Sequence, residues 1–125
     1  MSSEEIKQDF ESALIKHLAF KARLRSFLYG NNASEGPLRD PDQCVLGRWI
    51  AERRQGDYRQ VPEMADLDRH HRQIHIEANR LMDQYQAGHQ TEAQAGFAGV
   101  QRTADDIVHL LQTIENRVRT AVTSG

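Results

Sequence analysis

The sequence predicts an all-α protein, an antiparallel helical bundle of three long helices plus one short helix that resembles a four-helix bundle. Two observations lead to this prediction. All three prolines, and four of the glycines, lie in or beside residues 37–62, so the breaks in regular structure are concentrated there. On both sides of this window, apolar residues recur in steps of three and four, as they do on one face of a helix.

The first long helix is expected over residues 3–29. Ser3 is a candidate cap at its start, and Glu4 and Glu5 suit the positive end of the helix dipole. Gly30 follows the last residue, where glycine commonly ends a helix. The expected inward face consists of Ile6, Phe10, Ala13, His17, Phe20, Leu24 and Phe27.

The remaining elements follow from turn residues and from the same apolar spacing. Residues 30–43 are rich in turn formers and predict a loop, and residues 44–53 predict the short helix. Pro62 opens the next long helix, and Gly88 breaks it. The last helix is expected over residues 90–121. The inward face of the third helix would be Leu67, His71, Ile74, Ala78, Leu81 and Tyr85. A heptad pattern in the last helix comprises Phe97, Val100, Ala104, Ile107, Leu111, Ile114, Val118 and Ala121.

The composition fits one soluble domain over residues 1–125. A net charge of −2 creates no field that would attract nucleic acid or a membrane surface. The N-terminus lacks the features of a secretory signal, and no stretch approaches the roughly 20 apolar residues of a membrane span. A single cysteine cannot form an internal disulfide and is best preserved in a reducing compartment. We therefore expect a cytoplasmic, stand-alone domain whose two ends suit a full-length protein.

The slim shape of such a bundle favours self-association. Each long helix would extend roughly 40 Å at 1.5 Å per residue. A bundle this narrow often completes its core with a second copy, so we expect a homodimer. The regular apolar face of the last helix is a candidate dimer surface.

Four metal-ligating residue types stand at positions where a core should be apolar. His17 lies on the inward face of the first helix, and His71 and His75 are four residues apart, which places both imidazoles on one side of a helix. Cys44 starts the short helix, where a thiol ionises more readily. Three imidazoles and one thiolate would form a closed tetrahedral shell that suits zinc better than calcium or magnesium.

The residues by themselves leave another interpretation open. A single histidine on an apolar face is most often a core histidine bonded to a backbone carbonyl, and a single buried cysteine is most often a packing residue. The pair His70 and His71 could be solvated, with the spacing to His75 a coincidence. The prediction of a zinc site therefore depends on several such features occurring together in one chain.

Three sequence blocks, in order and at matching intervals, resemble the chemoreceptor zinc-binding (CZB) domain family. HLAFK at residues 17–21 is similar to the HxxWK block of that family, CVLGRW at 44–49 to its CxLGxW block, and LDRHHRQIH at 67–75 to its LxxxHxxxH block. The resemblance covers about residues 10–85 and implies a helical, usually dimeric domain that holds Zn²⁺ through three histidines and one cysteine. Carried over by motif, these ligands are His17, Cys44, His71 and His75.

Residues around the motifs are expected to support the site. Leu46 and Trp49 would anchor the short helix to the core and thereby fix the cysteine sulfur. Gly47, which lacks a Cβ, would let that helix approach a long one closely. Phe20 replaces the usual tryptophan of the family with another aromatic residue. Lys21 could influence the thiolate if it points inward, although a solvated lysine is the simpler expectation.

The family resemblance implies sensing or regulation. Its members commonly sit on chemotaxis receptors or on enzymes that produce cyclic-di-GMP, and they are linked to responses to zinc and to oxidants such as hypochlorous acid. Four protein ligands leave no position for a substrate, so we do not expect an enzyme. Cys44 is the most oxidisable ligand, and its oxidation, or a change in zinc occupancy, would alter the bundle or dimer conformation and signal to a separate partner, a chemoreceptor or a diguanylate cyclase.

The sequence is also compatible with three other functions. A stand-alone domain could serve as a zinc buffer. A hemerythrin-like di-iron bundle would need about five histidines and bridging carboxylates on the core faces, whereas only three histidines lie suitably here and the carboxylates fall mostly on outer faces. His70, His89 and His109 match no ligand position of the CZB family. A metal-free helical interaction module is the third alternative.

Overall fold

The computed structural model describes residues 1–31 and 33–124, so Asn32, within the predicted loop, lies outside the described residues. The described part folds as a helical bundle and contains no strand, which confirms the all-α prediction. Its helices are α1 (Ser3–Leu28), α2 (Glu35–Arg39), α3 (Val45–Gln55), α4 (Glu63–Gln86) and α5 (Gln90–Ser124).

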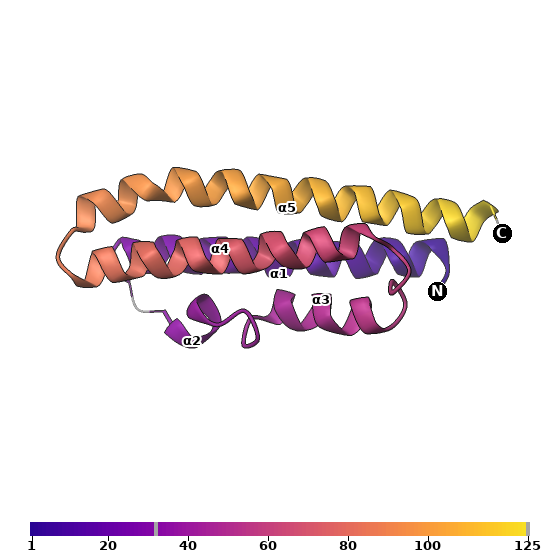
Figure 1. Cartoon of the computed structure of the whole chain (residues 1–125), viewed down its shortest axis with the longest axis horizontal. Helices are drawn as coiled ribbons and strands as arrows, with labels where there is room; N and C mark the ends of the chain where they lie inside the picture. Colours follow the sequence, from indigo (N-terminus) through magenta and orange to yellow (C-terminus); the bar gives the residue numbers. More distant parts are fainter. Residues whose placement is uncertain (32, 125) are drawn as a thin grey trace.

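If only the three long helices are counted, their directions do not alternate along the chain. Figure 1 shows α1 and α4 running the same way, with α5 and α3 running the opposite way. Contacts near the chain ends agree: Arg117 of α5 pairs with Glu63 at the start of α4 at 2.6 Å, and Arg119 donates to Ser3 at 3.0 Å. The α2–α3 segment serves as the return connection between α1 and α4, so the bundle has the up-and-down order of a four-helix bundle.

The start of α1 corrects one predicted cap. Ser2, not Ser3, is the N-cap: its hydroxyl accepts from the Glu5 N–H at 3.1 Å, while the Glu5 carboxylate accepts from the Ser2 N–H at 3.2 Å. This reciprocal capping box requires the serine three residues before the glutamate, which selects Ser2. At the other end, Leu28 is fully buried and Phe27 only half-buried, because a step of four from Leu24 continues the inward face.

The loop predicted for residues 30–43 is wrong in its middle, where α2 forms. Pro37 is its third residue, and the N–H groups of the first turn have no intrahelical partner, so proline costs no hydrogen bond there. Leu38 is the buried residue of α2 and anchors it on the bundle. Gly36 and Pro37 are typical turn residues, which is why the sequence predicts a loop here.

The boundaries of α3 and α4 lie close to their predicted positions. Cys44 is the N-cap of α3, which places it at the helix start as predicted, and Gly56 is the C-cap. Pro62 caps α4, and Gly88, with φ of +94°, follows its end in the left-handed region that favours glycine. Tyr85, predicted to face inward, is half-buried.

The apolar face of α5 packs inside the chain. Its residues from Phe97 to Ile114 are buried against α1 and α4, Val118 is half-buried, and Ala121 is exposed. This face is therefore not free to serve as the predicted dimer surface, because α4 and α1 cover it within one chain. The homodimer itself stays a prediction. None of the described helices combines the length and apolar character of a membrane span.

Candidate metal centre

Three of the four predicted ligands meet in the core. Cys44, at the start of α3, lies beside His71 and His75 on α4, and one ligand atom from each residue lies within 4.8 Å of the others. All three side chains are buried, with 2–3% of their surface exposed. The four-residue spacing of His71 and His75 places both imidazoles on one side of α4. The N-terminus of α3 lies against that side and adds the thiol of Cys44.

Hydrogen bonding orients His75 toward that point. Its Nδ1–H donates to the Leu38 carbonyl of α2 at 2.8 Å, which leaves Nε2 as the unprotonated nitrogen of the neutral ring. That Nε2 lies 3.1 Å from Nε2 of His71. Two nitrogens bound to one tetrahedral zinc lie about 3.3 Å apart for zinc–nitrogen distances of 2.0–2.1 Å. The donor set and its spacing therefore fit a zinc ion.

His17 is buried nearby but is not part of this cluster. Its Nε2–H donates to the Ala104 carbonyl of α5 at 3.1 Å, which turns that nitrogen toward α5. The ring is still close enough to His71 to affect the pKa of that residue. A metal bound by His17 would use the other ring nitrogen, Nδ1, and the hydrogen bond to Ala104 would then serve as the outer partner that metal-bound histidines usually have.

The protein keeps these histidines uncharged. Burial is the main cause that lowers the pKa of His17, His71 and His75. For His71 the pKa falls to about 3, because burial and, to a lesser degree, the positive charge of nearby Arg72 disfavour the protonated ring. Neutral imidazole is the form that binds a metal, so the core holds the rings in the protonation state that metal binding requires.

The predicted supporting residues lie around the cluster in different ways. Phe20 packs on the His75 ring, with 4.7 Å between ring centroids. Gly47 faces the Pro41 carbonyl and the His71 ring so closely that a Cβ would lie 2.8 Å from His71 Cε1. Leu46 is buried, whereas Lys21 is half-buried beside a surface groove between α1 and α5, as expected for a solvated lysine.

Trp49 is bonded to α1 through a hydrogen bond that the sequence does not predict. Its Nε1–H donates to the Asp9 carboxylate at 3.1 Å, and the same carboxylate accepts from Arg53 at 2.7 and 2.8 Å and from the Tyr58 hydroxyl at 2.7 Å. The rings of Phe10 and Trp49 meet edge to face at 5.3 Å. Burial raises the pKa of Asp9, but the hydrogen bonds from Arg53, Tyr58 and Trp49 hold it below its usual value. Asp9 thereby fastens α3, and Cys44 at its start, to α1.

The remaining histidines contribute no ligand to the cluster. His70 donates to the Asp66 carbonyl of its own helix at 2.8 Å, and His89 and His109 are exposed. The candidate metal cluster found among residues 1–31 and 33–124 contains no carboxylate. A di-iron site of the hemerythrin type, which needs bridging carboxylates, gains no support from this arrangement.

Fold and site together define a helical bundle with a buried cysteine–histidine cluster that could hold a metal ion. The family model of the chemoreceptor zinc-binding domain matches residues 17–82, more than half of the 125 residues. The chain therefore belongs to this zinc-binding domain family, and the matched segment runs from His17 past His75. Searches of curated proteins and of solved structures found no match.

Proposed function

We propose that this chain is a zinc-binding sensory or regulatory domain of the cytoplasm, without catalytic activity, in which Cys44, His71, His75 and His17 hold one Zn²⁺. The observation that carries the proposal is the convergence of a thiol and two neutral imidazoles in a water-poor core. Membership of a zinc-binding family supports the choice of metal. His17 completes the shell through Nδ1, which gives the closed site expected of a non-catalytic zinc.

The four proposed ligands come from three helices of the bundle. His17 belongs to α1, Cys44 caps α3, and His71 and His75 belong to α4. Bound zinc supplies a cross-link between these helices and makes the folding of the region dependent on metal. α3 depends most on this link, because it has only 11 residues and its other polar anchors, the Asp9 cluster and the Arg54–Asp68 pair, hold its middle and its C-terminal part.

Cys44 makes the site sensitive to oxidants. Attack of the thiolate on hypochlorous acid gives sulfenic acid and chloride, RS⁻ + HOCl → RSOH + Cl⁻, with sulfur oxidised and chlorine reduced. The sulfur then loses its charge and its strength as a ligand, which releases the start of α3. The altered surface is read by a second copy of the chain in a homodimer and by a separate signalling protein of the chemotaxis or cyclic-di-GMP type.

The test compares wild-type protein with Cys44→Ser. We expect a chelator to lower the melting temperature of the wild type, and hypochlorous acid to release zinc from it, with α3 losing protection in hydrogen exchange. The variant should bind zinc more weakly and show no response to oxidant. Equal zinc affinity and equal oxidant response in the two proteins would refute the switch, and an unchanged melting temperature after chelation would favour a metal-free interaction module.

A further inference from the structure

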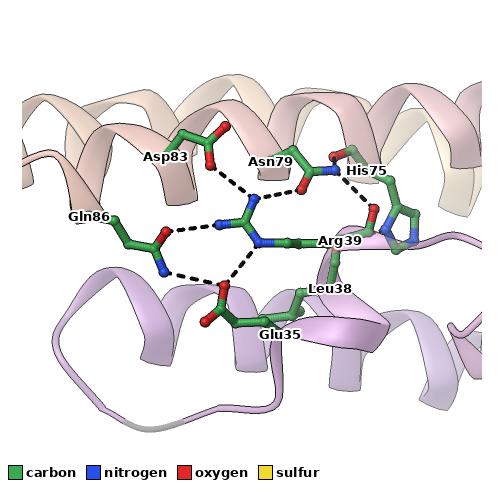
Figure 2. A network of polar contacts seen from close by, with 7 residues as sticks. All are labelled: Glu35, Leu38, Arg39, His75, Asn79, Asp83 and Gln86. Atoms are coloured by element: carbon green, nitrogen blue, oxygen red, sulfur yellow. Dashed lines mark hydrogen bonds and ion pairs between the residues drawn. The ribbon is translucent and has the colours of Figure 1, made fainter.

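The short helix α2 is held on α4 by the guanidinium of Arg39. Figure 2 shows this side chain between α2 and α4, with every nitrogen engaged. Nε donates to Glu35 of its own helix at 2.9 Å. Nη1 donates to Asn79 and to Asp83 at 2.9 Å each, and Nη2 donates to Gln86 at 3.1 Å. Arg39 therefore contacts three successive turns of α4.

Asn79 connects this network to the metal centre. Its Nδ2 donates to the Arg39 carbonyl and to the His75 carbonyl, each at 2.9 Å (Figure 2). The residue before Arg39 is Leu38, whose carbonyl accepts the Nδ1–H of His75 at 2.8 Å. The backbone at residues 38 and 39 is thus tied to α4 at His75 itself and at Asn79, one turn later.

α2 needs these contacts to stay in place. A helix of five residues is far too short to be stable by itself. Leu38 is the buried residue that α2 contributes to the core. The polar network formed by Arg39 and Asn79 consequently sets where the Leu38 carbonyl lies, and that carbonyl selects which nitrogen of His75 carries the proton.

We propose that Arg39 and Asn79 are positioning residues for the metal centre: by docking α2 on α4, they hold the Leu38 carbonyl against His75 Nδ1 and so present Nε2 to the ion. The inference rests on the proposed zinc site. Because coupling between two equilibria is reciprocal, zinc bound at His75 strengthens the docking of α2 by the same factor by which docking strengthens zinc binding. α2 is then the element outside the ligand set that reports metal occupancy.

The experiment measures zinc affinity and the tautomer of His75 in Arg39→Met and Asn79→Ala. We expect zinc to bind about 10- to 100-fold more weakly, the range seen when outer partners of metal-bound histidines are removed. In the metal-free wild type, ¹⁵N NMR should show His75 with its proton on Nδ1, and the variants should show a mixture with Nε2–H. Hydrogen exchange at the Asp40 amide, which donates to the Gly36 carbonyl at 2.8 Å, should become faster in both variants.

The matched control is Arg117→Met, which removes an arginine–glutamate pair at the other end of α4. It should change zinc affinity by less than about twofold, because exposed ion pairs contribute little. Arg39→Lys keeps the charge but not the forked donor geometry, so it should behave like Arg39→Met and carries the test if that variant does not fold.

Unchanged zinc affinity in the Arg39 and Asn79 variants, or weaker affinity with an unchanged His75 tautomer, would overturn the inference. Failure of the wild type to bind zinc would instead refute the proposed function, and the tautomer of the metal-free protein would still decide whether α2 orients His75.

Discussion

Replacing Gly47 by alanine tests how closely α3 packs against the metal-ligating helix. The new Cβ would overlap the backbone carbonyl of Pro41 and lie 2.8 Å from His71 Cε1. Carbon atoms in contact are about 3.5 Å apart or more, so the His71 ring would have to move by about 0.7 Å. Overpacking of this kind costs about 1–3 kcal/mol, while alanine in place of glycine recovers up to about 1 kcal/mol of helix propensity.

The expected result is a net loss of about 1–2 kcal/mol in the free energy of unfolding of the metal-free protein. Zinc affinity should fall at least about tenfold, because metal–ligand distances tolerate only about 0.2 Å. Urea denaturation and a zinc competition assay measure the two quantities.

Gly99→Ala is the matched control within α5. A Cβ there would lie 3.6 Å from its nearest neighbour, Arg102 Nη2, which is ordinary contact. The same chemical change should therefore stabilise the protein by about 0.4–1 kcal/mol and leave zinc affinity unchanged. If Gly47→Ala were as stable as Gly99→Ala and bound zinc as tightly as the wild type, the close packing of α3 on His71 would be refuted.

Two further perturbations probe the core around the site. Asp9→Asn removes the charge that Trp49, Arg53 and Tyr58 share and should cost about 1–3 kcal/mol in urea denaturation; a variant as stable as the wild type would show that Asp9 does not fasten α3. Because the pKa of His71 lies at about 3 in the folded chain and near 6.5 when unfolded, the unfolded state binds the proton first as pH falls. The metal-free protein should lose up to about 1.4 kcal/mol per pH unit through His71 between pH 6.5 and 3, and a flat stability profile would contradict this.

Local patterns were sufficient to predict the long helices and most of the site. Apolar spacing placed His17 and His71 on core faces, and the turn residues before Cys44 placed it at a helix start. Gly47 was identified as a point of close approach, and the contacts with Pro41 and His71 explain why. Such features are encoded within a few neighbouring residues, which is why the sequence shows them.

Features that depend on distant partners were not predictable in this way. α2 contains Gly36 and Pro37, which are typical of a turn, and it forms because Arg39 finds partners on α4 some 40 residues later. Asp9 has the sequence context of a surface carboxylate, yet its partners begin 40 residues downstream at Trp49. The hydrogen bond that turns His17 toward α5 spans 87 residues.

Elemental analysis of the purified, zinc-saturated protein shows whether Cys44, His71 and His75 hold one zinc ion. His70→Ala is the matched control, because His70 neighbours the site but bonds to its own helix. We predict one zinc per chain in the wild type and in His70→Ala, and substantially less in Cys44→Ala and His71→Ala. Equal zinc content in all four proteins, or none in the wild type, would show that these residues do not form a zinc site.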